Sequence, residues 1–312
     1  MFGGDRIAFS PYWSAKLRTI PPRRYTVIFL IIIALLMGSV LRLSLAQGEN
    51  PLPALSDKVV SKIKTIAMIG KVRENNLYVF AKVGDSITVG ERYLYPFGTG
   101  LYQLRDHTYL QAVVDAYVKT PVREVTSFDN PSVASAVGWA AYNVLAPRSA
   151  DPYQCEAGES PLVCEYRIIQ PSVAFIMFGT NDVGYRTEDE FSRDMGEIVK
   201  TSMEMGVIPV LMTIPPQPRV PDRVVAFNGI IRDLAYNNDL PLIDVNAAFA
   251  PLPNSGLAYD NVHPSWPPGD EELAADFTVE NLTYGCTVRN LLTLQMLDLI
   301  WKAIQPDPKP TL

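Results

Sequence analysis

Long apolar runs recur along the chain, and they predict strands that are buried on both faces. The runs cover residues 77–83, 171–179, 206–216 and 240–249. Near-continuous apolar segments of this length are typical of parallel sheets, because helices cover both faces of such a sheet. We therefore expect these four segments to lie side by side in one sheet.

Segments with apolar residues at helical spacing separate or follow these runs. One covers residues 187–206, where Thr187 and Glu190 have the spacing of a capping box. Residues 222–238 and 288–304 show the same helical spacing. Strands that alternate with helices predict a three-layer α/β/α sandwich with a mostly parallel central sheet.

The N-terminal part has a different pattern. Residues 1–24 are basic, and the next seventeen residues are apolar or uncharged. We expect 1–24 to be a cytoplasmic leader and 25–46 to be either a transmembrane anchor or the hydrophobic region of a signal peptide. The remainder would then lie outside the cytoplasm, either anchored to the membrane or secreted. The predicted boundaries are a linker at 47–64, one domain at 65–305 and a tail at 306–312.

Composition and charge exclude some classes of protein. The chain is 48% hydrophobic and 19% charged, which suits a folded core and not a disordered chain. Its net charge is −6, and Lys and Arg are scattered beyond residue 24. Because nucleic-acid binding needs a concentrated basic surface, we expect no nucleic-acid partner.

The three cysteines leave two alternatives open. Cys155 and Cys164 lie close together in a loop-like stretch, and Cys286 stands alone. Outside the cytoplasm the close pair would form a disulfide, whereas otherwise all three would remain thiols. No histidine lies near either cysteine of the pair, so we expect no zinc site. We expect no other metal and no cofactor.

Residues suited to acyl transfer follow the predicted strands. Ser86 follows the first strand, Asn181 follows the second, and Asp260 and His263 come after the last. Because the carboxyl ends of parallel strands share one edge, these side chains should meet. A serine nucleophile needs a base, the base needs a carboxylate, and the oxyanion needs hydrogen-bond donors. The other histidine, His107, has no comparable surroundings, and we expect a structural or solvated role for it.

Three short motifs carry a resemblance to a known family. "GDSIT" at 84–88, "GTND" at 179–182 and "DNVH" at 260–263 resemble blocks I, III and V of the SGNH/GDSL hydrolases. The resemblance covers roughly residues 77–304. It implies a flavodoxin-like α/β/α fold and a serine-dependent reaction on an ester.

The resemblance also implies a role for each motif residue. Ser86 would be the nucleophile, His263 the base and Asp260 the partner of the base. The oxyanion hole would combine the N–H of Ser86, the Asn181 amide and a block II glycine, for which Gly138 is the best match although its surroundings depart from the family pattern. The supporting residues of the motifs would be Gly84, Asp85, Gly179 and Asp182.

The expected function is therefore cleavage of a carboxylic ester through an acyl-enzyme on Ser86. The ester could belong to a lipid, a small acyl compound or a carbohydrate. Two alternatives share the fold: an extracytoplasmic acyltransferase and a catalytically silent, membrane-tethered binding module. A metal-dependent phosphoesterase is disfavoured, because only one histidine lies near the motifs. The aromatic residues Tyr93, Tyr95, Phe97 and Tyr102 would either line a substrate cleft or pack within a loop.

Overall fold

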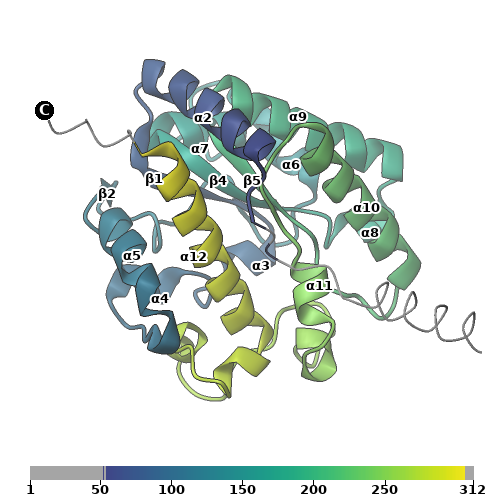
Figure 1. Cartoon of the computed structure of the whole chain (residues 1–312). Helices are drawn as coiled ribbons and strands as arrows, with labels where there is room; N and C mark the ends of the chain where they lie inside the picture. The colour runs from purple at the N-terminus through teal and green to yellow at the C-terminus, as the bar shows by residue number, and fades with distance from the viewer. Residues whose placement is uncertain (1–51, 53, 306–312) are drawn as a thin grey trace, which may run out of the picture. The chain divides into compact units, whose positions relative to one another are not determined.

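The computed structural model describes residue 52 and residues 54–305 (Figure 1). The expected leader at 1–24, the apolar segment at 25–46 and the tail at 306–312 lie outside this part. Among the described residues, no helix combines the length and the apolar character needed to cross a membrane.

The centre of the domain is a parallel sheet of four strands. Its strands are β1 (Asn76–Gly84), β4 (Pro171–Met177), β5 (Ile208–Met212) and β6 (Leu242–Ile243), adjacent in that order. Every residue of β4 and β5 is buried, as expected for strands covered on both faces. The predicted α/β fold with a mostly parallel sheet is confirmed.

Strand β6 is much shorter than its apolar run predicted. Asp244 follows it directly and accepts a hydrogen bond from the N–H of Ala247, which caps helix α11 (Val245–Phe249). The second half of the run, from 245 to 249, is therefore helical. An apolar pattern alone does not separate a buried strand from a short buried helix.

Helices cover both faces of the sheet. Helices α7 (Pro161–Ile169), α9 (Glu188–Glu204) and α10 (Pro221–Asn237) lie in the connections between successive strands. Because these connections all run in one direction across the sheet, the right-handed crossover rule puts them on one face. Helices α2 (Asp57–Val72) and α12 (Gly285–Ile304) pack against each other, and α12 crosses the front of Figure 1.

The predicted linker at 47–64 overlaps the first helix of the domain. Helix α2 begins at Asp57, and the Ser56 side chain caps it by accepting from the N–H of Val59. Ile63 and Ile66 are buried on its inner side. The prolines before the helix suggested a linker, yet the helical spacing of the apolar residues beyond them decides the structure.

Shorter elements connect this framework. They are α3 (Ser86–Val89), α4 (Tyr95–Thr99), η1 (Arg105–Leu110), α5 (Gln111–Val118), β2 (Pro121–Val122), β3 (Val125–Thr126), α6 (Ala141–Leu145), η2 (Pro147–Ser149), α8 (Asp182–Tyr185), η3 (Pro253–Gly256), η4 (Glu271–Ala275) and η5 (Asn281–Thr283). Strands β2 and β3 form a separate antiparallel pair.

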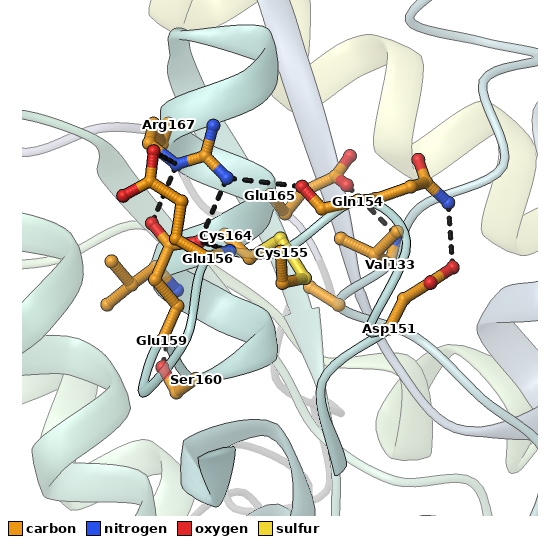
Figure 2. The surroundings of a disulfide bond; sticks show 12 residues. Val133, Asp151, Gln154, Cys155, Glu156, Glu159, Ser160, Cys164, Glu165 and Arg167 are labelled. Carbon is orange, nitrogen blue, oxygen red and sulfur yellow. Dashed lines mark hydrogen bonds and ion pairs between the residues drawn. A yellow bond between two sulfur atoms is a disulfide. The ribbon is translucent and has the colours of Figure 1, made fainter. Parts of the chain in front are cut away.

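A disulfide joins Cys155 to Cys164 on α7 (Figure 2). The next residue, Glu165, is fully buried and accepts hydrogen bonds from the N–H of Val133 and the amide of Asn130, at 2.9 and 3.0 Å. Arg167 reaches back from the same helix to Glu159 at 2.6 Å. The disulfide-closed loop is thus tied to the segment that precedes Gly138.

Candidate active site

Strand β1 ends in a tight turn that presents Ser86. Asp85 is fully buried, and its carboxylate accepts from the N–H of Ile87 at 3.0 Å, which starts the single-turn helix α3. A Cβ on Gly84 would lie 2.4 Å from the Thr88 hydroxyl oxygen. No side chain fits there, so the turn needs glycine at this position.

Ser86, His263 and Asp260 form a continuous chain of hydrogen bonds. Ser86 Oγ lies 2.9 Å from His263 Nε2, and His263 Nδ1 lies 2.6 Å from Asp260 Oδ2. The other oxygen of Asp260 accepts from the N–H groups of Val262 and His263, both at 3.0 Å. Partial burial alone would raise the pKa of Asp260, but these hydrogen bonds lower it below its usual value. The carboxylate is therefore held ionised toward the imidazole.

Asn181 and the segment around Gly138 lie beside each other. Residues 134–136 pair with Gly84 as a short extension of the sheet, through bonds of 3.2 Å in each direction. Two residues later Gly138 has a φ of +77°. The carbonyl of Trp139 then accepts from the side-chain amide of Asn181 at 2.9 Å. This bond joins the second motif to the segment that carries Gly138.

The rest of the "GTND" motif supports this junction. Asp182 is fully buried and accepts from the N–H of Ala141 at 3.0 Å. Gly179 has a φ of +123°, and a Cβ there would lie 2.9 Å from a methyl group of Ile214. Both its conformation and its close packing therefore require glycine.

Two buried carboxyl groups lie below the site. Burial raises the pKa of Asp85 to about 6, against the opposing effects of the Ile87 N–H and the charge of Arg289. Burial likewise raises the pKa of Asp182 to about 6, opposed by the Ala141 N–H, and the charge of Asp85 adds to the increase. Both groups hold backbone in place, so they are structural supports of the motifs.

The sequence analysis missed Arg289. This residue of α12 is 2% exposed, and its guanidinium donates to the carbonyl of Ile87 at 2.7 Å and to the Thr88 hydroxyl at 3.3 Å. It also stacks on the ring of Tyr93, 3.5 Å from the centroid. A charged residue on the buried stripe of a helix is the signal that would have revealed it.

A cavity of about 270 Å³ opens next to Ser86 and His263. Its walls include Tyr93, Arg92 and Trp266, and none of these three was assigned to the site from the motifs. Of the aromatic residues between 93 and 102, Tyr93 lines the cavity, whereas Phe97 is fully buried in the core. Tyr93 therefore meets the expectation of a residue that lines a cleft, and Phe97 meets the expectation of a residue packed within the loop.

His107 lies apart from this constellation. It is on η1, where its ring meets Phe277 edge-on with 5.8 Å between the centroids. It does not line the cavity beside Ser86.

Comparison with known families decides the identity. The model of the GDSL-like lipase/acylhydrolase family matches residues 83–266, well over half of the chain. The chain belongs to this family. The GDSL-like hydrolase is therefore an ester-hydrolysing enzyme of the SGNH type, as the three motifs predicted. The matched range contains Ser86, Asn181, Asp260 and His263.

Several solved structures are similar to the GDSL-like hydrolase, all at low identity. An acetylxylan esterase from Geobacillus stearothermophilus is 19% identical, and the match covers 71% of this chain and 94% of that one, with a TM-score of 0.45. A carbohydrate esterase family 3 structure from Talaromyces cellulolyticus is 18% identical, with 70% and 97% covered and a TM-score of 0.44. A GDSL-like lipase from Bacteroides thetaiotaomicron is 15% identical, with 71% and 88% covered and a TM-score of 0.40. No curated protein sequence matches the chain.

Proposed function

We propose that this GDSL-like hydrolase cleaves a carboxylic ester through an acyl-enzyme formed on Ser86. The observation that carries the proposal is the chain of hydrogen bonds from Ser86 Oγ through His263 to Asp260, at 2.9 and 2.6 Å. Serine is a weak nucleophile until a base takes its proton, and an imidazole oriented by a carboxylate is the usual base.

Each atom of the chain has a role in the reaction. With Nδ1–H donating to Asp260, Nε2 of His263 is free to accept the Ser86 proton as Oγ attacks the carbonyl carbon. The protonated imidazole then gives this proton to the leaving alcohol as the carbon–oxygen bond breaks. Water repeats the sequence in the second half, with His263 as base, and releases the acid and free Ser86.

The developing oxyanion needs donors that are already in position. The proposed donors are the N–H groups of Ser86 and Gly138 and the free amide hydrogen of Asn181. Support comes from the bond between Asn181 and the Trp139 carbonyl, which brings the two loops together at the end of β1. Donors of this kind each contribute about 10²- to 10³-fold to turnover.

A fluorophosphonate probe tests the nucleophile directly. We expect covalent labelling of the wild-type protein at Ser86, and no labelling of Ser86→Ala or His263→Ala. Thermal unfolding of both variants serves as the control for folding. A folded wild-type protein that stays unlabelled would contradict the proposal.

The proposal includes a location outside the cytoplasm, with the chain held at a membrane through residues 25–46. Two observations support it: the charge-free residues 25–41 that follow the basic residues 1–24, and the disulfide between Cys155 and Cys164. Disulfides persist mainly in oxidising compartments. We expect the full chain in the membrane fraction after alkaline extraction, and a chain lacking residues 1–46 in the soluble fraction. Equal distribution of the two would refute the anchor.

A further inference from the structure

The cavity beside Ser86 is bounded on its inner side by buried residues. Ile87 and Tyr93 are 5% and 4% exposed, and Arg289 is 2% exposed. They come from α3, from the segment after α3 and from α12. Cys286, which is half-buried and one turn before Arg289 on α12, also lines the cavity. The cavity therefore has a buried inner side.

The inner wall exposes little charge although it contains an arginine, because Arg289 is only 2% exposed. The guanidinium of Arg289 is already bonded to the Ile87 carbonyl and the Thr88 hydroxyl and stacked on Tyr93. Its Nε–H is buried without a hydrogen-bond partner in the described part of the chain. Burial also raises the pKa of the Cys286 thiol to about 11, so this group stays neutral at ordinary pH.

The outer wall is aromatic. The guanidinium of Arg92 lies over the Trp266 ring, 4.6 Å from the centroid, and forms an ion pair with Glu271 at 3.3 Å. Pro264, directly after the catalytic histidine, also lines the cavity. The charge of Arg92 is thus paired with that of Glu271 at this wall.

Three groups surround the reacting carbon, and the cavity can hold one of them. The oxyanion faces Asn181 and Gly138, and neither of these residues lines the cavity. The alcohol must leave halfway through the reaction, whereas the acyl group stays bound to Ser86 until water arrives. A cavity with a buried inner side suits the group that stays.

We propose that this cavity binds the acyl group and selects uncharged acyl chains longer than acetyl. The inference rests on Ser86 being the nucleophile, as proposed above. A volume of about 270 Å³ has room for roughly nine groups the size of a water molecule, at ~30 Å³ each. The cavity therefore holds chains of up to roughly eight carbons. Each methylene that enters it should raise kcat/KM about fourfold.

A series of p-nitrophenyl esters from acetyl to dodecanoyl tests the inference, because only the acyl group changes. We expect kcat/KM to rise from acetyl and to fall beyond roughly eight carbons. Cys286→Phe fills part of the cavity and should move the optimum to shorter chains. Cys286→Ala enlarges the cavity and should move the optimum to longer chains, so it decides the question even where the Phe variant fails to fold. Val279→Phe adds the same ring at an exposed position outside the cavity and should change nothing.

Acetate esters of alcohols of increasing size form the second arm. If Cys286→Phe changes selectivity in this series and not in the acyl series, the cavity binds the alcohol and the inference is wrong. A wild-type optimum at acetyl would overturn it as well. Fluorophosphonate labelling separates this failure from that of the proposed function: labelled protein without chain-length selectivity refutes the acyl cavity alone, whereas unlabelled protein refutes Ser86 as the nucleophile.

Discussion

Removing the disulfide should lower the stability of the domain by an amount that follows from its loop length. Cys155 and Cys164 are 9 residues apart, and closing so short a loop removes conformational entropy from the unfolded chain. The chain-entropy relation gives about 2.6 kcal/mol at 25 °C. For a domain of this size that corresponds to a decrease in Tm of roughly 5–10 °C. The double variant Cys155→Ser/Cys164→Ser provides the perturbation.

The assay is thermal and urea unfolding of the wild type and the double variant, each with and without a reducing agent. Reduced wild type should unfold at the same temperature and urea concentration as the double variant, and the reducing agent should not change the stability of the double variant. Because Glu165 follows Cys164 and holds the N–H of Val133, hydrogen exchange should also increase at Val133. A loss of stability below about 1 kcal/mol would show that the loop is already ordered without the bond, and the entropic reasoning would then be refuted.

Three further predictions concern the site and its supports. Gly138→Ala should lower kcat at least tenfold, because φ of +77° strains any L-residue by about 1–2 kcal/mol. The control is Gly158→Ala, at φ +87° in equally open space, which should cost similar stability and leave kcat unchanged. Equal kcat values for the two variants would refute a role for Gly138. Arg289→Met should lower kcat by about 10- to 100-fold, because it loses the charged hydrogen bonds to α3. KM should stay nearly unchanged, and Arg289→Lys should recover part of the lost kcat. Kinetics like those of wild type would refute the positioning role. Asp182 binds its proton more tightly in the folded protein, with a pKa of about 6, so its contribution to stability decreases as pH rises from about 4 to 6. Asp182→Asn keeps an acceptor for the N–H of Ala141, and in urea titrations its free energy of unfolding should gain up to about 3 kcal/mol relative to wild type across this range. A difference that does not change with pH would contradict the assignment.

The residues that a short motif defines were predictable because local sequence determines their geometry. Gly84 and Asp85 fix the turn before Ser86 through contacts within a few residues, and Asp260 reaches His263 across three residues. The order of the motifs along alternating strands and helices then brings them to one edge of the sheet. Fold and candidate nucleophile thus follow from patterns that are visible without a structure.

The walls of the cavity could not be predicted in the same way. Arg289 contacts Ile87 across 202 residues, and no spacing along the chain encodes that contact. Trp266 and Cys286 join the same cavity from different segments, and their meeting depends on how α12 packs. The start of helix α2 was missed for a simpler reason: the prolines before it led to a predicted linker whose end lies inside the helix.

The long separation between Ser86 and its partners also has a consequence for how the enzyme is made. Polypeptide synthesis at about 5–20 residues per second puts roughly 10–40 s between the addition of Ile87 and that of Arg289. His263 is added 177 residues after Ser86, so the serine exists for most of this interval without its base. A nascent or truncated chain that ends before α12 therefore carries the GDSIT motif without Cys286 and Arg289, the two residues that α12 contributes to the cavity. If Arg289 positions α3 as inferred above, esterase activity should be acquired only when α12 docks, at the end of biosynthesis.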